Sequence, residues 1–208
     1  MDINIELLKY DVSRETLQKL KDFVSLLEMW NTRMNLVSKN SLADVWERHI
    51  LDSMQLVQYI SADTKRIVDI GSGSGFPGIV LAIWLQEKMP ASEIFLVESI
   101  AKKTMYLNDV CVRLGLNNVK ILNERIENTV FKDVDIITAR AVAALDILLS
   151  YSMHIGQTHT KMLFPKGQSY EIENSEAQKK WAYDLQVHPN RYHEDGVILE
   201  ISKLRKKK

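Results

Sequence analysis

The segment VDIGSGSGFPG at residues 68–78 constrains the fold more than any other part of the chain. It lies between a short apolar run and a longer one, so it predicts a tight turn that joins a strand to a helix. Gly71, Gly73 and Gly75 carry no Cβ, which allows the turn and a close approach of a ligand to the backbone. Pro77 suits the first position of the following helix because its φ is already set. Ligands of open parallel sheets bind beyond the carboxyl ends of the strands, so we expect the binding site at this turn.

Strand-like and helix-like segments alternate from residue 66 to residue 183, which predicts an α/β fold with a mainly parallel, doubly wound sheet. The expected strands are 67–70, 94–97, 119–122, 134–138 and 161–164, and the expected helices are 78–85, 102–114, 145–155 and 171–183. Two further alternating runs, 185–188 and 197–201, have no helix between them and predict an antiparallel edge at the C-terminus.

The first 60 residues predict an N-terminal helical extension to a main domain at 61–208. Ser13 is a plausible N-cap, and apolar residues follow it in steps of three and four, as expected for one face of a helix. A second helix is expected from about Ser41 to Ile60.

Composition limits the class of protein. The 208 residues carry 27 basic and 27 acidic side chains, so the net charge is zero and composition does not indicate a strongly basic nucleic-acid binder. The longest apolar run, 79–85, is far shorter than the roughly 20 residues that span a membrane. The N-terminus lacks signal-peptide features, and one cysteine excludes an intrachain disulfide. We therefore expect a cytoplasmic protein without membrane contact.

The glycine-rich turn is compatible with two nucleotide ligands. Gly73, Gly75 and Gly78 match the dinucleotide pattern G-x-G-x-x-G, which alone is a weak signal. Asp69 precedes the glycines at the end of the strand and would repel a diphosphate, whereas it suits a ligand with positive charge such as S-adenosylmethionine. A glycine turn without any ligand is the third interpretation.

Two further segments fit a bound nucleoside. Glu98 ends the second predicted strand and suits the two hydroxyls of a ribose, although a solvated glutamate is the plainer interpretation. Ile126 and Glu127 follow the third strand and come within reach of an adenine ring by topology, although a solvated loop also fits.

If the ligand is S-adenosylmethionine, motifs that are missing from the sequence exclude two classes of methyl acceptor. Methylation of an exocyclic amine usually requires an Asp/Asn-Pro-Pro-aromatic motif after the fourth strand, where this chain has TARAVA at 138–143. Methylation of a pyrimidine at C5 needs a cysteine nucleophile, but Cys111 has apolar neighbours in a predicted helix and reads as a core residue. One cysteine and five scattered histidines show no metal-ligand spacing, so no metal site is predicted.

Basic residues follow the strands at the edge of the sheet where the methyl acceptor should bind. Arg140 and Lys166 follow the fourth and fifth strands and suit a phosphate-bearing acceptor, although each could be a surface ion-pair residue. Arg48, His49 and Asp52 cluster on the second helix, where Arg48 and Asp52 are also spaced for an exposed ion pair.

The last six residues, KLRKKK, concentrate positive charge on a body that otherwise has 22 basic and 27 acidic residues. Such a tail is either a frayed, solvated terminus or a contact to a polyanion. Its cations are Lys203, Arg205, Lys206, Lys207 and Lys208.

Taken together, these motifs resemble one family. RHILDS at 48–53, VDIGSGSGFPG, VESIAKK at 97–103, ARAVA at 139–143 and the Lys-Gly after the fifth strand are similar to the bacterial ribosomal RNA small subunit methyltransferase G family, also called glucose-inhibited division protein B. The resemblance covers nearly the whole chain. It implies a Rossmann-like class I methyltransferase fold and methyl transfer from S-adenosylmethionine to N7 of one guanosine in 16S rRNA.

The resemblance also assigns residues. Gly71, Phe76, Ile126, Glu127 and Arg140 fall on the cofactor positions of the family. The implied partner is 16S rRNA or the small ribosomal subunit, bound by a monomer. The residues expected to contact RNA are Arg48, Lys102, Lys103, Lys166 and the five cations of the tail. Lys103 stands where an arginine is common, and Pro165 where a smaller or aliphatic residue is usual.

The chemistry of guanine N7 agrees with the exclusions. N7 offers an in-plane lone pair and carries no proton, so its methylation needs no general base. Arg140, Lys166, His49 and Asp52 are therefore expected to position the reactants. Because the methylated ring gains positive charge, we expect Arg140 on a phosphate or on the cofactor carboxylate and not beside N7. An NAD-type dehydrogenase and a non-catalytic ribosome-assembly factor remain the alternatives.

Overall fold

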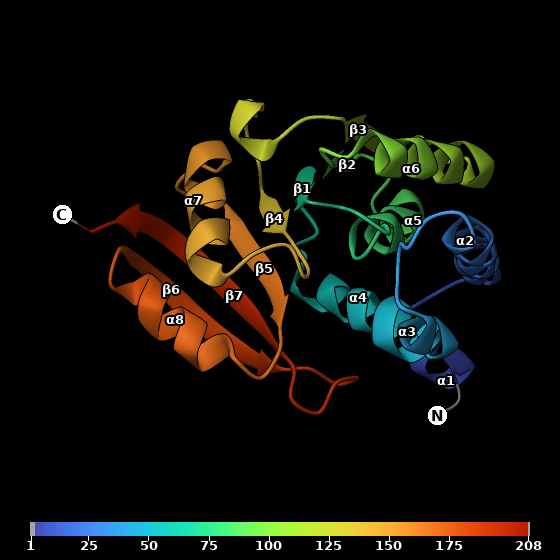
Figure 1. Cartoon of the computed structure of the whole chain (residues 1–208), viewed down its shortest axis with the longest axis horizontal. Helices are drawn as coiled ribbons and strands as arrows, with labels where there is room; N and C mark the ends of the chain where they lie inside the picture. The colour runs from blue at the N-terminus through green and yellow to red at the C-terminus, as the bar shows by residue number, and fades with distance from the viewer. Residues whose placement is uncertain (1–2, 208) are drawn as a thin grey trace.

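Seven strands form one sheet in the computed structural model, which describes residues 3–207 (Figure 1). Their order is β3-β2-β1-β4-β5-β7-β6, with β1 to β5 parallel and β7 antiparallel to both β5 and β6. This arrangement confirms the predicted mainly parallel sheet with an antiparallel C-terminal edge. The strands are β1 Arg66–Ile70, β2 Glu93–Val97, β3 Val119–Leu122, β4 Ile136–Thr138, β5 Lys161–Lys166, β6 Trp181–Pro189 and β7 Val197–Lys206.

Helices cover both faces of the sheet, as the doubly wound prediction requires. Ile67 of β1 packs in a core cluster with α5 and α6, whereas the next residue, Val68, packs in a second cluster with α7. Successive strand residues point to opposite faces, so β1 contributes to both cores. The main helices are α5 Gly78–Lys88, α6 Ala101–Leu114, α7 Leu145–Ile155 and α8 Tyr170–Gln178, with the short helix η3 Ile126–Asn128. Within residues 3–207, the helices are all too short or too polar to cross a bilayer.

The N-terminal helices extend the core on one face. Helix α1 (Ile3–Leu8) precedes α2 (Arg14–Asn31), and the Ser13 hydroxyl accepts a hydrogen bond from the Thr16 N–H at 3.1 Å, which confirms the predicted N-cap. Leu20, Phe23 and Leu27 of α2 are fully buried in the cluster that contains α5. The extension is thus part of the same hydrophobic core as the sheet.

The prediction of one continuous second helix is wrong. The segment consists of α3 (Lys39–Ala43), the π-helical turn η1 (Trp46–Leu51), α4 (Asp52–Met54) and the 3₁₀ turn η2 (Gln55–Tyr59). Its apolar stripe is retained, but the buried polar side chains Asp52 and Gln55 bond to distant parts of the chain. Single π-turns of this kind are frequent at functional sites.

Several predicted boundaries also shift. Strand β5 continues through Pro165, which lies opposite Ile198 in the antiparallel ladder, instead of ending before it. Helix α8 ends at Gln178, because Trp181 starts β6 and is buried with its indole N–H donated to Asp146 at 2.7 Å. Pro77 is the N-cap of α5 and therefore precedes its first turn by one residue.

The basic C-terminus is a strand, so the expectations of a strand end at residue 201 and of a frayed tail are wrong. Strand β7 continues to Lys206, with Arg205 opposite Ala182 and Lys206 opposite Trp181. The Lys203 ammonium lies 2.7 Å from the Asp184 carboxylate, and the Lys207 N–H donates to the Lys180 carbonyl at 2.8 Å. Lys208 lies outside the described residues. The ladder with β6 orders this segment, which its charge alone does not reveal.

We expect truncation after Ser202 to lower the free energy of unfolding by about 2–4 kcal/mol, because each lost backbone hydrogen bond costs about 0.5–1.5 kcal/mol. Urea unfolding followed by circular dichroism measures the loss. The matched control is the full-length double variant Lys203→Gln/Arg205→Gln, which keeps the ladder and should stay within about 0.5 kcal/mol of wild type. A truncated protein as stable as this control would contradict the contribution of the ladder.

Candidate active site

The loop after β1 turns through three left-handed glycines at the carboxyl edge of the sheet. Gly71, Gly73 and Gly75 have φ angles of 65°, 50° and 89°. A Cβ on Gly71 would lie 2.8 Å from a methyl group of Val142 in the loop after β4. A Cβ on Gly75 would lie 2.8 Å from Ile79, inside the protein. Gly71 and Gly75 thus allow the loop to pack on Val142 and on α5, whereas a Cβ on Gly73 would meet no atom nearer than 3.5 Å.

Asp69 lies beneath this loop. Its side chain is fully buried without an ion-pair partner among residues 3–207, and burial raises its pKa to about 7 although the nearby Ser72 hydroxyl and Gly78 N–H lower it. A Cβ on Gly78 would lie 2.5 Å from one of these oxygens, so a glycine is required where α5 begins. The expected direct contact between Asp69 and a ligand stays a prediction, since the carboxylate faces the start of α5.

Glu98 connects the loop to the end of β2. One carboxylate oxygen accepts the Gly73 N–H at 3.0 Å, and the other accepts the Ile100 N–H at 2.8 Å. The carboxylate adjoins a hollow that we call the β3-side hollow, whose walls include Ile126 and Glu127. The structure thus brings together the residues that the sequence assigned to a ribose and an adenine.

A second hollow of about 390 Å³, the central hollow, lies between the glycine loop and residues 36–41 of the N-terminal extension. It shares Gly71 with the β3-side hollow. It shares His49 and Arg140 with a third hollow of about 290 Å³, the hairpin-side hollow, which also contains Lys166 and residues of the β6–β7 loop. The three hollows therefore lie next to one another along the carboxyl edge of the sheet.

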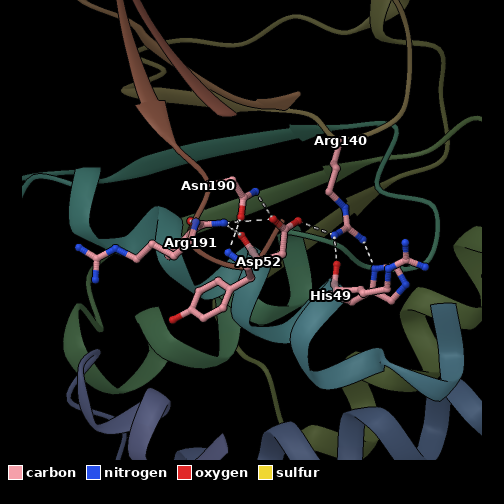
Figure 2. A network of polar contacts seen from close by, with 8 residues as sticks. His49, Asp52, Arg140, Asn190 and Arg191 are labelled. Atoms are coloured by element: carbon pink, nitrogen blue, oxygen red, sulfur yellow. Dashed lines mark hydrogen bonds and ion pairs between the residues drawn. The ribbon is translucent and has the colours of Figure 1, made fainter. Parts of the chain in front are cut away.

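Arg140 stands at the junction of the central and hairpin-side hollows, held by the N-terminal extension (Figure 2). Its guanidinium donates to the Asp52 carboxylate at 2.8 Å and to His49 Nδ1 at 2.6 Å, and lies 5.1 Å from the centre of the Phe76 ring. The His49 ring stacks on Phe76 with 4.7 Å between ring centroids. Burial, together with the charges of Arg140 and Arg48, lowers the pKa of His49 to about 3, so His49 is neutral and accepts at Nδ1.

Asp52 also binds the C-terminal hairpin. Its second oxygen accepts from the amide of Asn190 at 2.6 Å and from the amide of Gln55 at 3.0 Å (Figure 2). The alternative of an exposed Arg48–Asp52 ion pair is wrong, since Asp52 is buried and its charged partner is Arg140. Sequence reasoning missed Asn190, because no local pattern shows that a loop residue meets a helix residue 138 positions away. It also missed Gln55, which lies only three positions from Asp52.

Of the remaining predicted cations, some lie at the carboxyl edge of the sheet and the others lie far from it on β7. Lys166 lines the hairpin-side hollow, but its ammonium is 2.7 Å from Glu173 and donates to the Ala143 carbonyl at 2.9 Å. Lys103 lines the central hollow, while Lys102 is exposed on α6. The cations of β7 lie elsewhere. Nine steps along this ten-residue strand, at about 3.3 Å each, put Lys206 about 30 Å from the start of β7.

Comparison with known proteins identifies the family. A model of rRNA small subunit methyltransferase G matches residues 16–195. The chain belongs to the rRNA small subunit methyltransferase G family. It is 39% identical over 196 residues to ribosomal RNA small subunit methyltransferase G of Rickettsia bellii, which covers 94% of this chain and 98% of that protein. The corresponding protein of Cereibacter sphaeroides is 38% identical over 198 residues, covering 95% and 96%.

Solved structures share the fold at low sequence identity. A SAM-dependent methyltransferase from Aquifex aeolicus superposes with a TM-score of 0.58 at 13% identity, over 86% of this chain and 97% of that one. M. jannaschii TYW2 in complex with AdoMet gives 0.57 at 18% identity, over 76% of each chain. These similarities confirm the predicted Rossmann-like class I methyltransferase fold.

Family membership also confirms the predicted activity class. This member of the family is an S-adenosylmethionine-dependent enzyme that acts on small-subunit rRNA. The dehydrogenase alternative is therefore wrong. The weak G-x-G-x-x-G match arises because Gly75 and Gly78 are required by packing against α5 and Asp69.

Asp69 should make the stability of the cofactor-free enzyme depend on pH. Its ordinary pKa is 3.8 and its folded-state pKa is about 7, so between these values the folded protein holds a proton that the unfolded chain has lost. The resulting stabilisation is complete below pH 4 and is lost as the pH rises through 7, at up to about 1.4 kcal/mol per pH unit.

We expect Asp69→Asn, which stays neutral, to gain stability relative to wild type as the pH rises from 4 to 7. Urea unfolding across this range measures the difference in the free energy of unfolding. The exposed Asp63→Asn is the control and should leave the pH dependence of wild type in place. A constant difference between Asp69→Asn and wild type would show that Asp69 is ionised throughout.

Proposed function

We propose that the enzyme transfers the methyl group of S-adenosylmethionine to N7 of a guanosine in small-subunit rRNA, with the base received in the hairpin-side hollow. This proposal rests on one observation: the hydrogen-bond acceptor atoms beside Arg140 are already occupied by donors of the protein itself. Asp52 accepts from Arg140, Asn190 and Gln55, and His49 accepts from Arg140. These residues hold one another in place and have no free acceptor directed at a substrate proton. Such a site suits an acceptor atom that has no proton to lose.

The β3-side and central hollows fit the cofactor. Gly71 lines both hollows, and Gly73 leaves the floor of the central hollow open, where a side chain would fill the space. Glu98, at the end of β2 beside Gly73, offers carboxylate oxygens to the ribose hydroxyls, and Ile126 and Glu127 form a wall for adenine. Phe76, packed under His49 and Arg140, closes the inner side of the central hollow. When bound, S-adenosylmethionine supplies the electrophilic methyl group.

Positioning is then the main task of the protein. The N7 lone pair must lie in line with the methyl–sulfur bond, and such alignment is worth roughly 7–11 kcal/mol. Methylation adds positive charge to the guanine ring, so an unpaired cation beside N7 would oppose the reaction. Arg140 and Lys166 avoid this, because each is paired with a carboxylate at 2.8 Å and 2.7 Å. Both residues therefore shape the pocket as neutral ion pairs.

The RNA would contact the exposed cations around this edge. Arg48 lines the hairpin-side hollow, and Lys102 is exposed on α6. Lys203, Arg205 and Lys206 lie toward the far end of β7, so they would bind phosphates distant from the methylated nucleotide. We propose that a monomer binds 16S rRNA, either free or assembled in the small subunit.

Nucleoside analysis tests the product. We expect radiolabelled S-adenosylmethionine and unmodified small-subunit rRNA to yield 7-methylguanosine, detected by chromatography after complete digestion. Parallel reactions with free rRNA and with assembled subunits identify the substrate. Gly73→Val, which fills the floor of the central hollow, is the inactive control. Label in a different nucleoside would refute the N7 assignment, and RNA binding without transfer would favour the assembly-factor alternative.

The rate of methyl transfer should not depend on pH if the chain supplies no general base. Single-turnover rates, measured with saturating cofactor and RNA, are expected to change less than about twofold between about pH 6.5 and 8.5. His193 is exposed at the hairpin-side hollow and is the residue to exclude, so His193→Ala should show the same flat profile. A tenfold rise per pH unit in wild type would require a proton-bearing acceptor and a base.

A further inference from the structure

The charges around the central hollow are unequally matched. Two cations line it: Arg140, which follows β4, and Lys103, which lies in the first turn of α6. Arg140 is neutralised by Asp52 at 2.8 Å, and its side chain is 16% exposed. In the neighbouring hairpin-side hollow, Lys166 is likewise neutralised by Glu173. The protein thus supplies a counter-charge for Arg140 and for Lys166.

Lys103 has no such counter-charge. Within residues 3–207 its ammonium group makes no hydrogen bond and no ion pair, although the residue is half-buried. The ammonium lies 3.8 Å from the point that a Cβ on Gly73 would occupy, so it stands directly beside the floor of the hollow. Glu98 Oε2 lies 3.9 Å from the same point, but no ion pair joins Glu98 to Lys103 among residues 3–207, and the two Glu98 oxygens accept the backbone N–H groups of Gly73 and Ile100. A half-buried cation in this position calls for an anion from a ligand.

The cofactor carries one suitable anion. S-adenosylmethionine has an α-carboxylate, an α-ammonium and a sulfonium, and its two cationic groups would be repelled by Lys103. We propose that Lys103 binds the α-carboxylate of the cofactor. The inference rests on the placement of the cofactor proposed above, and it reassigns a residue that the sequence had linked to RNA. Lys102 lies on the same helical turn but differs from Lys103, because it is exposed and does not line the central hollow. Lys102 therefore stays available to RNA phosphates.

This assignment gives the charged groups of the site separate tasks. Lys103 holds the amino-acid end of the cofactor in the central hollow, and Glu98, which lines the β3-side hollow, holds the ribose. Arg140, already paired with Asp52, shapes the boundary toward the base. The sulfonium is then kept away from the one uncompensated cation of the hollow, because the carboxylate fixes the end of the ligand that lies beside Lys103.

The test compares two ligands that differ at the amino-acid end. S-adenosylhomocysteine carries the α-carboxylate, whereas 5′-methylthioadenosine has the same adenosine and thioether without it. Isothermal titration of both ligands is done on wild type, Lys103→Met, Lys103→Arg and the matched control Lys102→Met, after circular dichroism has verified folding.

We expect Lys103→Met to weaken S-adenosylhomocysteine about ten- to a hundredfold, the loss typical of a hydrogen bond to a charged group, and to leave 5′-methylthioadenosine within twofold. Lys103→Arg should recover most of the affinity, and Lys102→Met should change neither ligand. A Lys103→Met variant that binds both ligands as wild type does, or weakens both equally, would overturn the proposal.

The alternative role of Lys103, contact with an RNA phosphate, predicts a different result. If Lys103 binds a phosphate instead, Lys103→Met would leave S-adenosylhomocysteine unchanged and reduce the salt dependence of RNA binding by about 0.7 in the slope of log affinity against log salt. Failure of wild type to bind S-adenosylhomocysteine would overturn the cofactor placement itself, which separates that failure from a failure of the role of Lys103.

Discussion

The buried carboxylate of Asp52 joins three segments that lie far apart in the sequence. It accepts from Arg140 after β4, from Asn190 in the β6–β7 loop and from Gln55 in its own helical segment. A buried charge is tolerated when it is paired and hydrogen-bonded, and removing one partner of such a pair typically costs about 3–5 kcal/mol. Asp52 therefore sets where the N-terminal extension and the C-terminal hairpin meet the carboxyl edge of the sheet.

The shape of the active site follows from that junction. Arg140 is drawn toward Asp52 and His49, which places it above Phe76 and divides the central hollow from the hairpin-side hollow. The chain then passes through Ala141 with a φ of 55°, a left-handed conformation that costs an alanine energy. The next residue, Val142, packs against Gly71 of the glycine loop. The position of the glycine loop and the position of the Asp52–Arg140 pair therefore depend on each other. The space between them is the proposed cofactor site.

Charge pairing separates the polar residues into those that build the site and those free for ligands. Arg140 and Lys166 are paired with Asp52 and Glu173, so neither brings uncompensated charge to the base. Lys103 has no charged partner within residues 3–207 and faces the hollow. The proposed N7 methylation, whose product is positively charged, would benefit from this division, because unpaired positive charge would lie at the far end of the cofactor.

Local sequence patterns determined the glycine loop, the alternation of strands and helices, and the position of Glu98 at the end of β2. These features depend on φ angles, on apolar periodicity and on strand order, which are encoded within short stretches of chain. The family resemblance rested on the same local motifs.

Tertiary structure alone decided which polar groups meet. The pairing of Asp52 with Arg140 and Asn190, the breaking of the second helix into α, π and 3₁₀ turns, and the ordering of the basic C-terminus as β7 all depend on contacts between distant residues. Burial and pairing energies act between positions that no local pattern connects, so they become visible only when the chain is folded.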